Sequence, residues 1–215
     1  MKRAILLTGF TPFGSEDVNP SWEAVRALDG TLIGGHRVHA VRLPTEFGAS
    51  LPALRAALRS VDPRVAIAVG LAGGRSGLSL ERVAINVIDA RIPDNAGAQP
   101  IDVPVIRGRP AAYFSTLPIK RALLALHDAG LPAHVSQTAG TYVCNQVFYA
   151  LMDAARRRRG LRAGFVHVPY LPGQGRRLHQ PSMPLDDMVR AIGIVARAAL
   201  TKNPRDTAAS AGAES

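Results

Sequence analysis

Short apolar runs and helical stripes of hydrophobic residues alternate along the chain. The first run, Ala4–Phe10, is followed by glycine and proline and predicts a buried strand. Asn19 and Pro20 predict a helix start, because the asparagine side chain accepts a backbone hydrogen bond and proline lacks an N–H that would be unpaired there. The pattern predicts further strands at His36–Leu43, Val65–Leu71, His134–Gln137 and Gly164–Val168, a bent strand or hairpin at Leu78–Ala90, and helices at Asn19–Leu28, Pro52–Arg59, Pro118–Ala129, Thr141 or Val143 to Arg159, and Pro184–Leu200.

Strands that alternate with helices favour an α/β fold. We expect a single three-layer domain: a doubly wound, largely parallel twisted sheet with helices on both faces. No internal repeat or linker interrupts residues 1–200, whereas the small and polar residues of 201–215 predict a disordered tail. In such folds, sites form at the carboxyl ends of strands. The candidate residues below all lie at or near such an end, or on the helix that follows it.

The composition indicates a globular protein with one sizeable core. The chain has 215 residues, of which 47% are hydrophobic and 20% charged. No apolar run approaches the roughly 20 residues that a membrane helix needs, and the apolar start is too short for a signal peptide. A single cysteine excludes an internal disulfide and suits a reducing compartment. We therefore expect a cytoplasmic protein that does not bind membranes.

The formal net charge of +10 makes an anionic partner such as nucleic acid worth weighing. The one dense basic run, Arg156–Arg159, falls at the end of a predicted helix, where cations complement the helix dipole. No nucleic-acid-binding motif is visible, and aromatic residues make up only 5% of the chain. We therefore predict that the protein does not bind nucleic acid.

Cys144 follows a predicted strand and a glycine turn, in the first turn of a predicted helix. Free N–H groups and the positive end of the helix dipole stabilise a thiolate there and can hold an oxyanion. Free cysteines are also among the most buried residues, so the residues alone leave open whether Cys144 is a nucleophile or an inert core side chain.

Of the six histidines, His167 stands apart because it lies late in an otherwise apolar strand. A buried imidazole needs hydrogen-bond partners, and a thiol on one ring nitrogen with a carboxylate on the other would supply both. A core histidine bonded to backbone is the alternative. Glu81, a carboxylate in an apolar β-rich stretch, can orient His167 or pair with Arg75 or Arg82.

Four segments together resemble the bacterial pyroglutamyl peptidase I family, also called pyrrolidone-carboxylate peptidases. They cover the chain from about residue 4 to 200. The segments are Thr8–Gly14 with Val18–Pro20, Gly70–Arg75 with Glu81, Asn86–Gly97, and Thr138–Asn145 with Phe165–Tyr170. The resemblance implies that residues 1–200 form a pyroglutamyl peptidase catalytic domain, which removes N-terminal pyroglutamate from peptides. It also implies that the enzyme needs no cofactor or metal, and that it forms a homo-oligomer, a tetramer or a dimer.

The resemblance further implies a role for each matching residue. Glu81, Cys144 and His167 would form the catalytic triad, and Arg91 would assist the oxyanion; from the residues alone, Arg91 can equally pair with Asp89 or Asp94. The substrate ring would contact the following aromatic and aliphatic residues: Phe10, Phe13, Ile92, Tyr142 and Val143. For Phe10, plain core packing is an equal alternative.

Two positions depart from the family pattern. Tyr142 replaces a phenylalanine of many relatives and adds a hydroxyl to the predicted ring pocket, and Leu71 replaces a glutamine of some. A serine or metal hydrolase on the same scaffold is a weaker alternative, because the segment around Ser76 lacks the second glycine of a nucleophile elbow and no metal-ligand spacing is present. An inactive relative is disfavoured since all three triad residues are present.

Overall fold

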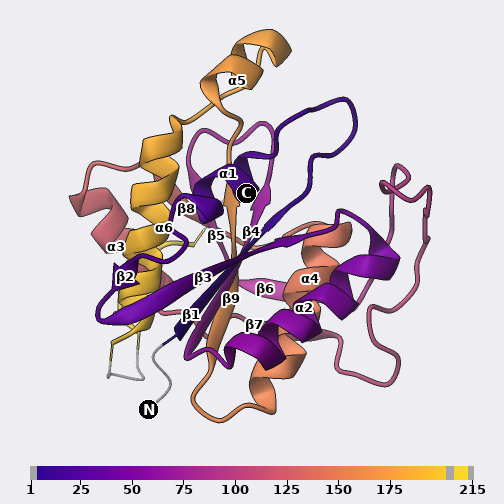
Figure 1. Ribbon diagram of the computed structural model, residues 1–215, viewed down its shortest axis with the longest axis horizontal. Helices are drawn as coiled ribbons and strands as arrows, with labels where there is room; N and C mark the ends of the chain where they lie inside the picture. The colour runs from indigo at the N-terminus through magenta and orange to yellow at the C-terminus, as the bar shows by residue number, and fades with distance from the viewer. Residues whose placement is uncertain (1–3, 202–205, 213–215) are drawn as a thin grey trace.

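A seven-stranded sheet runs through the middle of the computed structural model, which describes residues 4–201 and 206–212 (Figure 1). In spatial order its strands are β2 (Leu32–Ile33), β3 (His36–Leu43), β1 (Ala4–Phe10), β4 (Val65–Leu71), β9 (Arg162–Val168), β5 (Leu78–Glu81) and β8 (Ala133–Ser136). A small antiparallel pair, β6 (Val83–Ile85) and β7 (Ala112–Phe114), lies outside this sheet.

The sheet is mixed but mostly parallel. Strands β3, β1, β4 and β9 run parallel to one another, and β5 and β8 form a second parallel pair. The direction reverses where β5 meets β9, and at the edge where β2 meets β3. The predicted α/β domain with a largely parallel sheet is therefore confirmed, with β5 as the internal strand that runs the other way.

Helices cover both faces of the sheet (Figure 1). One face carries α1 (Pro20–Arg26), α3 (Ile119–Asp128) and α6 (Leu185–Ala199), and the other carries α2 (Phe47–Val61) and α4 (Val143–Arg156). A short helix, α5 (Pro172–Leu178), stands beyond the end of β9. Each face has its own cluster of buried apolar side chains, so the sheet is buried on both sides.

Most predicted elements are present, and the bounds of β1, β3 and β4 are those predicted. At the start of α1, the Asn19 side chain accepts a hydrogen bond from the Ser21 N–H, at 3.1 Å, as predicted. Of the two alternatives for Leu78–Ala90, the hairpin is wrong, because β5 pairs in the main sheet and β6 pairs with β7; the segment instead forms two successive strands that are interrupted at Arg82. The elements β2, β7 and α5 were not predicted; they are short and carry no clear periodicity.

Part of the predicted tail contacts the domain. The Asp206 carboxylate accepts hydrogen bonds from the N–H groups of Lys120 and Arg121, at 2.8 and 3.0 Å, and so caps the start of α3. Residues 202–205 and 213–215 of this segment lie outside the described residues, and the domain boundary at residue 200 stays a prediction. Within the described ranges, no helix is long and apolar enough to cross a bilayer.

Candidate active site

Cys144 is the second residue of α4, at the end of a loop that follows β8. The loop turns at Gly140, whose φ of 77° favours glycine. The helix starts from Tyr142, and no side chain caps its first N–H groups. These donors therefore remain available to a ligand beside the cysteine.

The sulfur of Cys144 lies directly over Gly70 of β4. A methyl group built on Gly70 would meet the sulfur at 2.8 Å and the Phe165 ring at 2.8 Å. Gly70 is also the strand neighbour of His167 in β9, and the two residues face the same side of the sheet. The Phe165 and His167 rings, two residues apart, contact each other with centroids at 4.8 Å. Because Gly70 has no side chain, the Cys144 sulfur can lie against β4, on the side of the sheet that His167 also faces.

His167 is held from behind by Glu81. Nδ1 of the imidazole lies 2.7 Å from Oε1 of the carboxylate, and the exposed fractions of these two side chains are 4% and 0%. The carboxylate accepts the Nδ1 proton, which leaves Nε2 as the unprotonated nitrogen of the neutral ring. The same oxygen of Glu81 accepts a hydrogen bond from Nη1 of Arg75, also at 2.7 Å. Two of the three partners that the sequence left open for Glu81, His167 and Arg75, are therefore present at once, whereas Arg82 does not pair with it.

The net electrostatic effect keeps the carboxylate ionised and the imidazole neutral. Burial raises the pKa of Glu81, but the hydrogen bond of His167, and after it those of Ser136 and Arg75, outweigh burial, and the net pKa is lowered. Burial is also the largest influence on His167 and lowers the pKa of its imidazole. Glu81 opposes this shift and Arg75 adds to it. The His167 ring therefore favours the neutral form in the resting protein.

The thiol of Cys144 is protonated in this resting arrangement. Burial, and after it the negative charge of Glu81, raises the pKa of Cys144 to about 12, while Arg75 lowers it. The expectation of a lowered thiol pKa at the helix start is therefore wrong for the free protein, because the packing around the sulfur outweighs the helix terminus. The side chain is still partly exposed, so a reactant can reach it.

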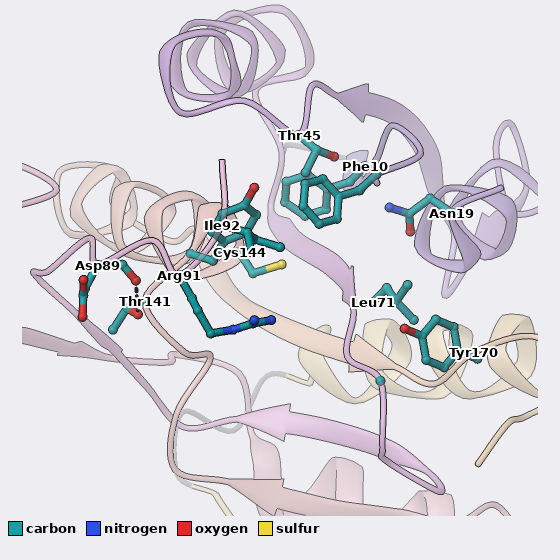
Figure 2. Close-up of a pocket in the computed structure, with 13 residues that line it drawn as sticks. Phe10, Asn19, Thr45, Leu71, Asp89, Arg91, Ile92, Thr141, Cys144 and Tyr170 are labelled. Carbon is teal, nitrogen blue, oxygen red and sulfur yellow. Dashed lines mark hydrogen bonds between the residues drawn. The ribbon is translucent and has the colours of Figure 1, made fainter. Parts of the chain in front are cut away.

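A cavity of about 400 Å³ opens in front of the Cys144 sulfur (Figure 2). Most of its wall is apolar or aromatic. The lining residues are Phe10, Phe13, Asn19, Thr45, Leu71, Gly73, Asp89, Arg91, Ile92, Thr141, Tyr142, Cys144 and Tyr170. The side chains of Asn19 and Thr45 are engaged with backbone groups: both donate to the Thr11 carbonyl, and Asn19 also accepts from the Ser21 N–H. A compact uncharged group would therefore meet apolar walls and backbone groups here.

The predicted ring-pocket residues separate into two groups. Phe10, Phe13, Ile92 and Tyr142 line the cavity, although Phe10 is only 2% exposed and also packs in the core. Val143 is fully buried and does not line it. The predicted contact between Val143 and the substrate ring therefore has no support from the cavity lining.

Arg91 is exposed at the cavity edge, and its side chain extends toward the open centre (Figure 2). One of its two possible partners is engaged elsewhere: the buried Asp94 carboxylate accepts hydrogen bonds from the N–H groups of Phe47, Ala96 and Ala98. Asp94 thereby anchors the loop that carries Arg91, a role that the turn pattern around it did not reveal.

The described ranges contain no group of three or more His, Cys, Asp or Glu side chains that could hold a metal ion. Two further contributors escaped the sequence reasoning. Gly70 is visible there only in an apolar run and a family segment, and Tyr170 only in a family segment; the pairing of β4 with β9 sets Gly70 beside His167, and Tyr170, just after β9, lines the cavity.

Comparison with known proteins decides the family. A family model described as pyroglutamyl peptidase matches residues 3–202. The pyrrolidone-carboxylate peptidase of Chromobacterium violaceum is 57% identical over 203 residues, which cover 93% of this chain and 94% of that protein. The chain belongs to the pyroglutamyl peptidase family. The enzyme class predicted from the sequence, a cysteine peptidase of the pyroglutamyl-peptidase I type, is thereby confirmed.

Solved structures of the family share the fold. The crystal structure of Bacillus amyloliquefaciens pyroglutamyl peptidase I superposes with a TM-score of 0.92 at 47% identity, covering 95% of this chain and all of that one. A mutant pyrrolidone carboxyl peptidase from the hyperthermophile Pyrococcus furiosus gives a TM-score of 0.89 at 42% identity, with 92% of this chain and 98% of that chain covered.

Tyr142 departs from the family pattern by its hydroxyl. This hydroxyl has a structural role and does not belong to the ring pocket. It donates to the Pro93 carbonyl at 2.9 Å, and its ring contacts Phe13 and Phe47 with centroids at 5.4 and 5.1 Å. Burial and the charge of Asp94 raise the pKa of Tyr142 to about 12, so the hydroxyl remains a donor. The tyrosine thereby ties the loop that carries Ile92 to the start of α4.

Tyr142→Phe is expected to raise KM for a pyroglutamyl amide by about 2- to 10-fold with little change in kcat, because one hydrogen bond to the loop is lost while both ring contacts remain. Steady-state kinetics measure KM and kcat separately. Tyr149→Phe is the matched control, since the Tyr149 hydroxyl also bonds a proline carbonyl, that of Pro110, away from the cavity. An equal KM in wild type and Tyr142→Phe would contradict the anchoring role.

Gly70→Ala is expected to lower kcat/KM on the order of 100-fold, because the added methyl group overlaps the Cys144 sulfur and must displace it. Activity assays and thermal unfolding would separate this effect from a loss of stability. Gly193→Ala on α6 is the control: its methyl group meets nothing within 4 Å, so activity should not change. Full activity of folded Gly70→Ala would show that the sulfur does not need this position.

Proposed function

We propose that this chain removes an N-terminal pyroglutamyl residue from peptides, with Cys144 as nucleophile, His167 as general base and acid, and Glu81 as the group that orients His167. The observation that carries the proposal is the 2.7 Å contact between Glu81 and His167, whose strand neighbour Gly70 lies under the Cys144 sulfur at an apolar cavity. An ionised acid, a neutral base and an accessible thiol in this order are the parts of a cysteine peptidase.

The reaction begins with a neutral thiol and a neutral imidazole. His167 takes the thiol proton as the sulfur attacks the pyroglutamyl carbonyl carbon, and the carbonyl oxygen becomes an oxyanion. The uncapped N–H groups at the start of α4 and the guanidinium of Arg91 stabilise this charge. Glu81 stabilises the imidazolium that His167 becomes when it takes the thiol proton.

The second half restores the enzyme. The tetrahedral intermediate collapses, its carbon–nitrogen bond breaks, and His167 gives its proton to the leaving amine, so that a thioester to Cys144 remains. His167 then takes a proton from water as the water attacks the thioester. Collapse of this second intermediate releases pyroglutamate, and the proton returns to the Cys144 sulfur.

The cavity supports the pyroglutamyl ring as the bound group. The lactam is compact, flat and uncharged, and its methylenes suit walls made by Phe13, Ile92 and Tyr142. A free amino terminus would bring a positive charge to these apolar walls, which costs free energy unless a carboxylate pairs with it.

Hydrolysis of a pyroglutamyl amide beside the matching prolyl amide, with and without a thiol-alkylating reagent, tests the proposed function. We expect turnover of the pyroglutamyl amide alone, and its loss after alkylation. Equal turnover of both amides, or activity that survives complete alkylation, would contradict the proposal.

We also propose, from the family resemblance, that the protein acts in the cytoplasm as a homo-oligomer, a tetramer or a dimer. Analytical ultracentrifugation measures the assembly state directly. A monomer at the concentrations used in the assay would contradict this part.

A further inference from the structure

Arg75 lies behind the Glu81–His167 pair, in the turn between β4 and β5. Its Nη1 donates to Oε1 of Glu81 at 2.7 Å, and Nδ1 of His167 reaches that same oxygen at 2.7 Å. The Glu81 side chain is fully buried, whereas the Arg75 side chain is 25% exposed. One carboxylate oxygen of Glu81 thus contacts two groups: the partly exposed guanidinium of Arg75 and the buried imidazole of His167.

The second arm of Arg75 reaches the loop that leads to the nucleophile. Nη2 donates to the Thr138 carbonyl oxygen at 3.5 Å, and the Ser136 hydroxyl donates to that oxygen at 3.0 Å. Thr138 begins the loop that ends at Cys144 in α4. A planar guanidinium has several donors in a fixed arrangement and can contact both groups at once.

We propose that Arg75 is a positioning residue of the reaction: it fixes the Glu81 carboxylate against His167 and offsets its charge, so that the imidazole stays unprotonated until Cys144 attacks. The inference rests on the proposed function, since it assigns the role through that triad.

The physical reason lies in the charges beside the buried imidazole of His167. A carboxylate alone beside His167 would favour imidazolium in the resting protein, and an imidazolium cannot accept the thiol proton. The cation of Arg75 offsets the carboxylate charge and leaves its hydrogen bond in place. The same cation lowers the pKa of the His167 imidazole, which keeps the acceptor nitrogen free in the resting protein, and lowers the pKa of the Cys144 thiol, which eases the loss of its proton.

The groups that act on His167 come from several elements. The titratable and charged groups around the pair are Glu81 on β5, His134 on β8, Arg75 in the turn and Cys144 on α4. His134 bonds the Ser79 hydroxyl at 2.9 Å. Partial burial, and after it the charge of Arg75, lowers the pKa of His134, while the charge of Glu81 opposes the shift.

The test compares the pH dependence of kcat/KM for a pyroglutamyl amide in wild type, Arg75→Gln and Arg75→Lys. Loss of the cation raises the pKa of His167, so the acid limb of the Arg75→Gln profile should move to higher pH. The ratio of kcat/KM at about pH 6 to that at about pH 8 should fall on the order of tenfold relative to wild type. Arg75→Lys keeps the charge, so its acid limb should stay in place while kcat falls because the fixed pair of contacts is lost.

Arg158→Gln is the matched control. Arg158 is 27% exposed, pairs with Asp62 at 3.6 Å and donates to the Leu58 carbonyl, away from the cavity. A merely structural role for Arg75 would lower the amount of folded enzyme without moving the profile, as expected for Arg158→Gln. An unmoved acid limb in Arg75→Gln would overturn the inference, and so would a limb displaced to higher pH in Arg75→Lys. The Arg75→Lys profile still tests the inference if Arg75→Gln does not fold.

The failure of the proposed function is distinguishable from the failure of this inference. Wild-type protein with no activity on the pyroglutamyl amide would contradict the function. An active wild type with the same profile in Arg75→Gln would contradict only the role of Arg75.

Discussion

Cys144→Ala is expected to lower the turnover of a pyroglutamyl amide by about 10⁴-fold or more, with the fold unchanged. The reaction has no other thiol to use, because Cys144 is the only cysteine in the sequence. Alanine leaves the helix start and the packing of α4 in place, since the sulfur is partly exposed at the cavity. Steady-state assays measure the loss, and circular dichroism with thermal unfolding checks the fold.

Chemical modification provides an independent form of the same experiment. An alkylating reagent can mark only Cys144, so the fraction of enzyme alkylated, measured by mass spectrometry, should equal the fraction of activity lost. The high thiol pKa of the resting site predicts that alkylation speeds up as pH rises above neutrality. Cys144→Ala protein that retained wild-type turnover would remove this residue from the mechanism.

Glu81→Gln is expected to lower kcat by about 10²- to 10³-fold while KM changes little. The glutamine can still meet Nδ1 of His167, but it carries no charge to stabilise the imidazolium, and its amide can hold the ring in the wrong tautomer. KM should hold because Glu81 does not line the cavity and so does not contact a bound ring. The loss should be smaller than that of Cys144→Ala, since the nucleophile remains.

Asp153→Asn is the matched control for Glu81→Gln. Asp153 is another buried carboxylate, 4% exposed, and it pairs with Arg157 and the Tyr113 hydroxyl near the end of α4. Its loss should lower stability and leave the kcat of the folded enzyme unchanged. If Glu81→Gln instead raised KM at constant kcat, the carboxylate would be a binding group and the proposed role would be wrong.

The elements that bring Cys144 and His167 to the sheet were predictable, because strands buried on both faces are continuous apolar runs with clear ends. β4 and α4 are examples: an apolar run ending at a glycine pair, and a turn followed by a helical stripe. The direction of β5 was not predictable. Its pairing with β9 joins residues more than eighty positions apart, and no local pattern encodes it.

That missing pairing explains what the sequence left undecided about the site. Whether Glu81 meets Arg75 or His167 depends on which strands flank β5, and the structure shows that it meets both. The thiol pKa escaped prediction for a similar reason. A helix start is visible in sequence, but the position of the sulfur against Gly70 of β4 is a tertiary feature, and burial in the folded protein raises the pKa of the thiol.

The reversed strand also has a consequence for how the enzyme responds to dissolved ions. Because β5 runs against β9, Ser79 pairs with His167 and Glu81 pairs with Phe165, which places the carboxylate deeper in the sheet than the imidazole. Dissolved salt weakens an exposed ion pair such as that of Arg26 with Glu23. Salt ions have little access to the buried Glu81 carboxylate. The chemical step should therefore be nearly indifferent to ionic strength, and any salt dependence of the rate should arise from the substrate's approach to the basic surface.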